Sequence, residues 1–374
     1  MASPAISLPR EMQALQITKY NAPYSLRTVP VPKPGPHDLL VKVAVASYCH
    51  TDSMVRAGAW GSALPQTASH EGSGTIVAVG ESVSSSSSFA IGDRVMCGIP
   101  LHPCGSCDEC TGPVETQRQY CRKTTGHIGV STHGCAAEYV IADARTTNKI
   151  PDSVSLMSAA PLACAGRTVY RAILQTGLEK RQWVAIVGAG GGLGHLGVQF
   201  ARALGLNVVA IDARDEGLAL ARECGANAVV DSRQDKAEVV KGVQALTDGG
   251  RGADAAIVLA DHAEALACAV TKMHGTVVQV AQPATLSIPF GELVFRDIRL
   301  RGSLVASAGE SEDMLRCVVD YGVKPVTNKF VGLGMEQVDA MLGLVGSGKM
   351  QGKAVLVVDP EQLRVEKDLG AEQF

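Results

Sequence analysis

The sequence predicts an α/β protein with a doubly wound parallel sheet and a second, mainly β domain. Three observations predict it. From Trp183 to about Val280, apolar runs of strand type alternate with segments whose apolar residues recur at helical spacing. A glycine-rich turn joins the first of these strands to the first helix, as in doubly wound nucleotide domains. The 374-residue length is enough for two domains, and further strand-like runs precede this region.

The glycine-rich turn predicts a dinucleotide site. The strand Trp183 to Val187 leads into it, and a helical pattern from His195 to Gly205 follows it. Glycines allow a sharp turn and close approach to a diphosphate, and the helix N-terminus offers free N–H groups. The turn consists of Gly188, Ala189, Gly190, Gly191, Gly192, Leu193 and Gly194.

An acidic residue completes this pattern. Asn207 to Ile211 reads as the next strand, and Asp212 follows it, 18 residues after Gly194. A carboxylate at this spacing binds ribose hydroxyls and repels a 2′-phosphate, so NAD(H) is favoured over NADP(H). Arg214 lies close by and keeps an NADPH-preferring protein as an alternative.

The remaining parallel strands and the helices between them follow the same alternation. We expect strands at Ala228–Val230, Ala255–Leu259 and Thr276–Val280, and helices at Asp215–Glu223, Lys236–Leu246 and His262–Met273. After Gly302 we expect helices near Glu312–Tyr321 and Glu336–Val345 and a closing strand at Ala354–Val358.

The N-terminal part reads as strands joined by loops. Residues up to about Gly35 are polar and interrupted by prolines. Strand-like runs then follow, and the serine run Ser84 to Ser88 reads as an exposed loop. The expected strands are Leu39–Ala46, Thr75–Val79, a third after Gly92 and Asp93, and Gly134–Ile141.

Composition excludes several functions. The chain is 46% hydrophobic and 19% charged with a net charge of −3, so no basic surface invites nucleic acid or acidic lipid. No apolar run has the length of a membrane span, and Met1 to Arg10 lacks the pattern of a secretory signal. We expect a cytoplasmic protein with no nucleic-acid or membrane partner.

The cysteines predict metal binding. Eleven cysteines, an odd number, argue against a disulfide framework in a cytoplasmic chain. Four of them have the spacing C-x2-C-x2-C-x10-C, which lets the thiolates converge on one ion and leaves no open coordination position. The sequence therefore predicts a structural zinc site at Cys104, Cys107, Cys110 and Cys121.

A second metal site is a weaker prediction from the residues alone. Cys49, His70 and Cys164 each lie at or near the end of an expected element. Two thiolates and an imidazole hold zinc with one position open, as Lewis-acid catalysis requires. Lone cysteines and histidines are more often packed in a core, so spacing does not establish this trio.

Several motifs together resemble the zinc-dependent medium-chain alcohol dehydrogenases, nearly from end to end, and most of all their microbial, typically tetrameric ethanol-type branch. Besides the glycine turn and the four-cysteine segment, they are C-H-T-D from Cys49, H-E-G-S-G from His70, G-D-R-V from Gly92 and A-P-L-A-C-A-G from Ala160. The resemblance implies a GroES-like catalytic domain over 1–160 with a zinc lobe at 97–125. It also implies a Rossmann domain over 161–302 and a C-terminal segment, 303–374, that returns to the first domain.

The resemblance also implies roles for single residues. Cys49, His70 and Cys164 would bind a catalytic zinc, beside which Glu71 is an occasional ligand. Asp52 would orient the ligating histidine, and Thr51 would pass the substrate proton. The implied cofactor contacts, besides the glycine turn and Asp212, are His50, Val280 and Lys353. The implied assembly is a homotetramer or homodimer, and the substrates are small alcohols or carbonyl compounds.

Two positions depart from the family pattern. Met54 replaces the histidine that usually ends the proton relay, and methionine cannot carry a proton. In the substrate pocket, Trp60 matches one tryptophan of the ethanol-type branch, whereas Ile99 replaces the other. A smaller side chain leaves room for a substrate bulkier than ethanol.

The leading interpretation is thus an NAD-dependent zinc alcohol dehydrogenase with two zinc ions per chain. An NADPH-preferring aldehyde reductase of the same superfamily is the close alternative. A catalytically silent NAD-binding protein is a third, supported only by Met54.

Overall fold

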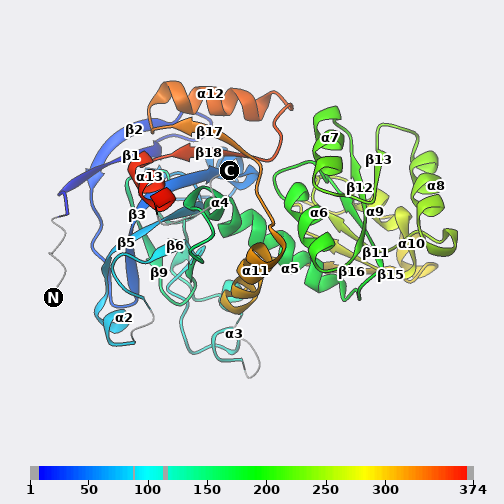
Figure 1. Cartoon of the computed structure of the whole chain (residues 1–374), viewed down its shortest axis with the longest axis horizontal. Helices are drawn as coiled ribbons and strands as arrows, with labels where there is room; N and C mark the ends of the chain where they lie inside the picture. The colour runs from blue at the N-terminus through cyan, green and yellow to red at the C-terminus, as the bar shows by residue number, and fades with distance from the viewer. Residues whose placement is uncertain (1–7, 87–88, 113–116, 369–374) are drawn as a thin grey trace.

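A computed structural model describes residues 8–86, 89–112 and 117–368. Figure 1 shows two bodies side by side, with the first and last parts of the chain in one and residues from the middle in the other. The predicted two-part α/β fold is confirmed.

The first body is built on a sheet of seven strands in the order β10-β6-β5-β3-β18-β17, with β9 also paired to β3. Its central strand is buried along nearly its whole length. The strands are β3 (Asp38–Tyr48), β5 (Glu71–Val79), β6 (Arg94–Met96), β9 (Tyr139–Asp143), β10 (Asn148–Lys149), β17 (Thr327–Val331) and β18 (Lys353–Val357).

Two smaller sheets complete this body. One has the order β2-β1-β4, and the other pairs β7 with β8. The polar N-terminal stretch therefore contains two strands that were not expected. The bounds are β1 (Glu11–Ile17), β2 (Ser25–Pro30), β4 (Gln66–Thr67), β7 (Pro100–Leu101) and β8 (Gly126–His127).

Short helices flank these sheets. The expectation of a loop at the serine run is wrong for Ser84 to Ser86, which end a helix; Ser87 and Ser88 lie outside the described residues. The helices are α1 (His50–Arg56), α2 (Glu81–Ser86), α3 (Asp108–Thr111), η1 (Arg118–Tyr120), α12 (Met335–Gly346) and α13 (Pro360–Asp368).

The second body is a six-stranded sheet in the order β13-β12-β11-β14-β15-β16, parallel at every pairing. The apolar runs are buried on both faces, as expected for a parallel sheet covered by helices. The strands are β11 (Trp183–Val187), β12 (Asn207–Asp212), β13 (Ala228–Asp231), β14 (Ala253–Val258), β15 (Thr271–Gln279) and β16 (Arg299–Gly302).

The helices of this body match the expected ranges closely, with one correction. The helix expected to reach Met273 ends at Val270, because Thr271 turns extended and its hydroxyl donates to the Ala267 carbonyl. The helices are α6 (Gly194–Ala203), α7 (Asp215–Glu223), α8 (Lys236–Leu246), η3 (Asp248–Gly250), α9 (Glu264–Val270) and α10 (Phe290–Val294).

Four helical segments link the two bodies. After α4 (Leu156–Pro161) comes the π-helix η2 (Leu162–Gly166), then α5 (Arg167–Thr176); α11 (Ala308–Tyr321) packs on α5. The last strands return to the first body, where β18 lies antiparallel to β3 with Ala354 opposite Tyr48. In Figure 1 these strands, orange and red, lie beside the blue N-terminal strands.

Candidate metal and cofactor sites

Four side chains from distant parts of the chain converge at one edge of the large sheet. Cys49 follows the end of β3, and His70 directly precedes β5. Because β3 and β5 are antiparallel with Ser47 opposite Glu71, these strand ends lie side by side. The π-helix η2, which packs against β5, brings in Cys164. One donor atom each of Cys49, His70, Glu71 and Cys164 lies within 4.8 Å of the others.

The histidine of this cluster is oriented by a carboxylate. His70 Nδ1 lies 3.0 Å from Asp52 Oδ1, and both side chains are almost fully buried. The same carboxylate accepts the Cys49 backbone N–H at 2.8 Å through Oδ2. With Nδ1–H engaged, the Nε2 lone pair of His70 faces the cluster, and that buried atom has no hydrogen-bond partner in the described structure.

This arrangement fits a metal ion. An imidazole nitrogen without a partner, two thiols and a buried carboxylate are the donors that zinc takes. A hydrogen bond from Cys164 lowers the pKa of Cys49 well below its ordinary value, which favours the thiolate that binds metal.

A buried ion pair adjoins the cluster. Lys353 Nζ lies 2.6 Å from Glu71 Oε2, and the lysine is only 2% exposed. The other oxygen of Glu71 accepts the Ala165 N–H at 3.2 Å. Burial lowers the pKa of Lys353, but the charges of Glu71, Cys49 and Cys164 and the hydrogen bond to Glu71 together outweigh burial, so the pKa is raised overall. Lys353 is therefore a fixed cation at the metal cluster.

The same lysine reaches the glycine turn. A side chain at Gly192 would meet Lys353 Cδ at 2.8 Å, so the turn and the lysine are in close contact. Lys353 thus lies between the metal cluster and the expected diphosphate position.

The glycine turn has the geometry that its sequence predicts. Gly188 has a φ of +89°, which favours glycine, and a Cβ at Gly190 would lie 2.0 Å from Gly217. The Gly190 N–H donates to Asp212 Oδ2 at 2.8 Å. The carboxylate is therefore held beside the turn, ahead of the N-terminus of α6.

Arg214 is engaged with this carboxylate and with a neighbouring loop. Its Nε lies 3.4 Å from Asp212 Oδ1, and its Nη1 donates to the carbonyls of Gly348 and Met350. The guanidinium thereby joins the nucleotide domain to the segment that leads into β18.

The structure shows the element and the burial of the other predicted cofactor and pocket residues. His50 is largely exposed, and its Nε2 lies 3.9 Å from Asp261 Oδ2 of the second body. Val280 directly follows β15. Thr51 and Met54 are half-buried on α1, Trp60 is exposed by 48%, and Ile99 is buried.

The four-cysteine cluster is separate and local. Donor atoms of Cys104, Cys107, Cys110 and Cys121 also lie within 4.8 Å of one another. The Cys104 N–H donates to Cys121 Sγ, and the backbone N–H of Ser106, donating to Cys104 Sγ, lowers the pKa of Cys104 to about 5. A ligand set made of four cysteine sulfurs fits a structural zinc ion.

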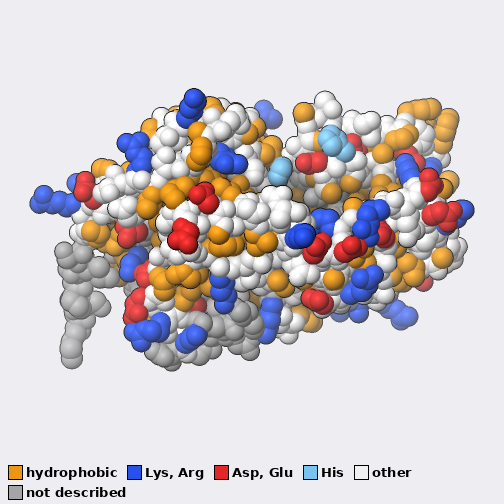
Figure 2. All heavy atoms as spheres, turned by 90° about the horizontal axis from the view of Figure 1, so that it is seen from above, with side chains coloured by type: hydrophobic (Ala, Val, Ile, Leu, Met, Phe, Trp, Pro, Cys, Tyr) orange, Lys and Arg blue, Asp and Glu red, His pale blue; other side chains and the backbone are white. Residues whose placement is uncertain are grey.

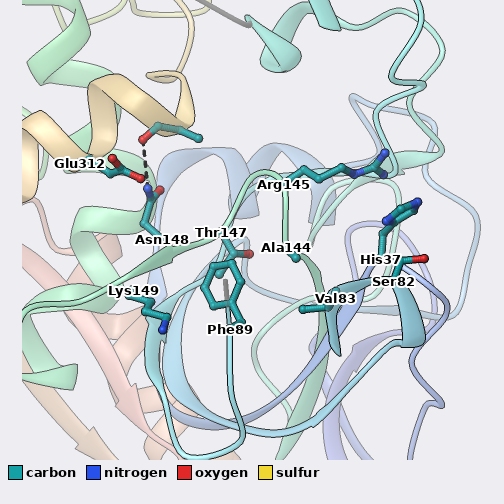
Figure 3. Close-up of a pocket in the computed structure, with 11 residues that line it drawn as sticks. His37, Ser82, Val83, Phe89, Ala144, Arg145, Thr147, Asn148, Lys149 and Glu312 are labelled. Carbon is teal, nitrogen blue, oxygen red and sulfur yellow. Dashed lines mark hydrogen bonds between the residues drawn. The ribbon is translucent and has the colours of Figure 1, made fainter. Parts of the chain in front are cut away.

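A third polar group was not anticipated from the sequence. Asp38, His102 and Asp143 lie together, but His102 Nε2 bonds Asp38 at 2.7 Å and its Nδ1 bonds Thr125 Oγ1 at 2.8 Å. Because both ring nitrogens are engaged, we assign no metal to it. An open pocket of about 720 Å³ beside β10 contains no residue of the two cysteine clusters (Figure 3).

Comparison with known proteins agrees with this geometry. The family model for the alcohol dehydrogenase GroES-like domain matches residues 35–152, and that for zinc-binding dehydrogenase matches 192–320. Alcohol dehydrogenase 1 of Emericella nidulans is 34% identical over 94% of this chain and 99% of its own. The chain therefore belongs to the zinc-binding alcohol dehydrogenase family.

Solved structures give the same result. The alcohol dehydrogenase of the hyperthermophilic archaeon Aeropyrum pernix has a TM-score of 0.82 and 30% identity, covering 92% of this chain and 99% of its own. A putative zinc-binding dehydrogenase of Sinorhizobium meliloti bound to NADP has a TM-score of 0.78 and 28% identity, covering 93% and 99%.

The predicted activity class and cofactors are confirmed at this level. The protein is an oxidoreductase of alcohols or aldehydes, and its clusters fit two zinc ions together with a nicotinamide cofactor. No helix in the described ranges has the length and apolarity needed to cross a bilayer. On the face drawn in Figure 2, charges of both signs are interspersed.

Proposed function

We propose that the chain is an NAD-dependent zinc alcohol dehydrogenase or aldehyde reductase whose substrates are bulkier than ethanol. The observation that carries the zinc assignment is the unpartnered, buried Nε2 of His70 among Cys49, Glu71 and Cys164. When bound, zinc supplies a Lewis acid to the substrate oxygen, and the nicotinamide gives or takes the hydride.

The residues around the cluster have distinct roles in this proposal. Asp52 keeps the proton of His70 on Nδ1, so that Nε2 stays available. Thr51 Oγ1 takes the hydroxyl proton of the alcohol and passes it outward. Met54, one turn further along α1, cannot continue that transfer, so solvent completes it.

The cofactor side favours NAD(H). Asp212 presents a nearly buried carboxylate, fixed by Gly190, where a 2′-phosphate would have to lie. Arg214 is already engaged with Asp212 and two carbonyls, which leaves it poorly placed to hold a phosphate. Gly188, Gly191 and Gly194 shape the turn for the diphosphate, with His50, Lys353 and Val280 around it. The NADP-bound relative keeps NADPH as the alternative to test.

Substrate size follows from two side chains. Ile99 is buried where the ethanol-type pocket has a second indole, and its smaller volume supports branched or aromatic carbonyl substrates. Trp60, 48% exposed, supports a pocket that opens to solvent on that side.

The exposed end of the second body supports a homodimer or homotetramer. β16 is an edge strand with all four residues exposed, and the nearby Phe290, Val294 and Phe295 are each more than 60% exposed. Unpaired edges and apolar patches of this kind favour association. Light scattering that gives the mass of a dimer or tetramer would support this, and a monomer mass would contradict it.

The eleven free thiols fit the reducing cytoplasm.

The test is oxidation of NADH, and of NADPH in parallel, with ethanal and with branched and aromatic aldehydes. We expect turnover with NADH that a chelator abolishes, and a higher kcat/KM for the larger aldehydes. Turnover only with NADPH would reverse the cofactor assignment, and ethanal as the best substrate would contradict the pocket assignment.

A further inference from the structure

A small, partly enclosed cavity lies where the four-cysteine lobe, the start of α5 and the start of α11 meet. Its volume is about 10 Å³, room for about one water-sized guest, so a small monoatomic ion suits it better than phosphate or a carboxylate. Its walls include Arg118 and Gln119 of the lobe, Arg145 before β10, Arg167 of α5 and Ala306 before α11.

The polar atoms at this cavity lack partners. Arg118 Nε, Arg167 Nε and both amide atoms of Gln119 are buried and make no hydrogen bond in the described part of the chain. Gln119 is 6% exposed and Arg167 only 1%. Leaving several buried N–H donors unsatisfied at one place is unfavourable, so a guest that accepts hydrogen bonds is expected there.

The charges at the cavity do not balance. Arg145 is held by both oxygens of Asp143, at 2.9 and 2.6 Å, but Arg118 and Arg167 have no carboxylate partner among the described residues. Among the described residues, Arg167 bonds only the carbonyls of Thr146 and Ala306, at 3.4 and 3.1 Å. The nearby Glu310 is paired with Arg171. Two uncompensated guanidinium groups, one fully buried, favour a negative guest over a neutral one.

We propose that this cavity is a binding site for a single halide ion, chloride under physiological conditions. The ion would accept hydrogen bonds from Arg118 Nε, Arg167 Nε and the Gln119 side-chain amide. Guanidinium and amide N–H groups bind anions well, and the small volume selects a monoatomic one. The ion would stabilise the junction between the zinc lobe, the helix that follows Cys164 and α11.

The structure also offers an entry route. The open pocket of Figure 3 shares Arg145 and Ala308 with the cavity. Figure 3 shows Arg145 at one side of that pocket and Asn148 at the other, bonded to the Ala308 carbonyl at 3.0 Å.

Bromide is a direct probe of the site. Crystals of the full-length protein grown without halide are soaked in sodium bromide, and anomalous scattering is recorded at the bromine edge. We expect a peak in the cavity, within hydrogen-bond distance of Gln119. Bromide peaks only at the surface, or a water in the cavity at high bromide, would overturn the proposal.

A solution measurement covers the case in which variants crystallise poorly. We expect sodium chloride, exchanged for gluconate at constant ionic strength, to raise the thermal unfolding midpoint by about 3–5 °C. Arg118→Met and Gln119→Leu should lose most of this chloride-dependent shift. Arg122→Met, an exposed arginine of the same lobe, is the matched control and should retain it. Equal chloride shifts in all four proteins would contradict the site.

Discussion

The two cysteine clusters are assembled in opposite ways. The lobe cluster takes all its ligands from Cys104 to Cys121, and its nearest hydrogen bonds come from its own loop, through Ser106 and Cys104. The other cluster takes ligands from three distant segments and is surrounded by buried charge, Asp52 on one side and Lys353 on the other. We propose that the closed local cluster serves stability and that the buried, charged cluster serves chemistry.

The largest expected effect is a loss of activity when a ligand of the buried cluster, rather than of the lobe cluster, is replaced. Cys49→Ser should lower kcat by about a thousandfold or more, because the substrate oxygen loses its Lewis acid. NADH affinity, measured by fluorescence titration, should stay within about twofold, since the glycine turn and Asp212 are untouched. Unchanged turnover would refute the assignment of this cluster.

The matched substitution in the lobe should lower stability and leave activity largely unchanged. Cys107→Ser should remove the lobe zinc and lower the free energy of unfolding by about 4 kcal/mol or more, because the metal holds the loop together. Turnover per folded molecule at low temperature should be largely retained. Calorimetry and initial rates on one preparation test this, and full stability of the variant would show that the lobe carries no structural metal.

The next prediction concerns Asp52, which supports the proposed catalytic cluster. Asp52→Asn should weaken zinc binding or activity by about 10- to 100-fold, because the carboxylate no longer fixes the His70 ring. Zinc competition with a chromophoric chelator measures the affinity separately from turnover. Ser106→Ala, which removes a neutral hydroxyl near Cys104 in the lobe, is the comparison and should have little effect on kcat.

These clusters also show what a sequence can and cannot reveal. The lobe ligands and the Gly188–Gly194 turn are readable because their geometry is local. The grouping of Cys49, His70 and Cys164 into one site was predicted only from a family resemblance, because their proximity depends on the β3–β5 register. The return of the C-terminal segment was expected, but the Lys353–Glu71 pair was not foreseen, because it depends on the register of β18 against β3. The strand β16 was not predicted, because it is short and arginine-rich. The predicted range of α9 extended too far toward its C-terminus, because the hydroxyl of Thr271 caps the helix.

A buried histidine, His195, makes the stability of the folded state depend on pH. His195 Nδ1 donates to the Gly191 carbonyl, and its Nε2 accepts the Val326 N–H at 3.1 Å. Burial lowers the pKa of His195 from 6.5 to about 4. Because the folded state binds this proton less well, the stability is fully present above about pH 6.5 and is lost as the pH falls toward 4.

We expect that loss to be about 3 kcal/mol over this range. Urea unfolding at pH 7, 5.5 and 4.5 measures it. His195→Gln should flatten the pH dependence, whereas His37→Gln, at an exposed histidine, should leave it as in the parent protein. An equal slope in His195→Gln and the parent would show that another group is responsible.

The smallest expected effect concerns the proton path. Met54→His should raise alcohol oxidation near neutral pH by about two- to fivefold, because an imidazole restores a proton carrier. Met54→Leu has similar size and no such group, so it should behave like the parent. A flat response of kcat in both variants would remove Met54 from the account of proton transfer.

The most direct test of two zinc sites with different roles is diffraction from the purified protein at the zinc edge. The account predicts two anomalous peaks per chain. One should lie about 2.1 Å from His70 Nε2 and between Cys49 and Cys164, and the other at the centre of the four lobe cysteines. A single peak in the lobe, in protein that still oxidises alcohols, would contradict the proposed catalytic site.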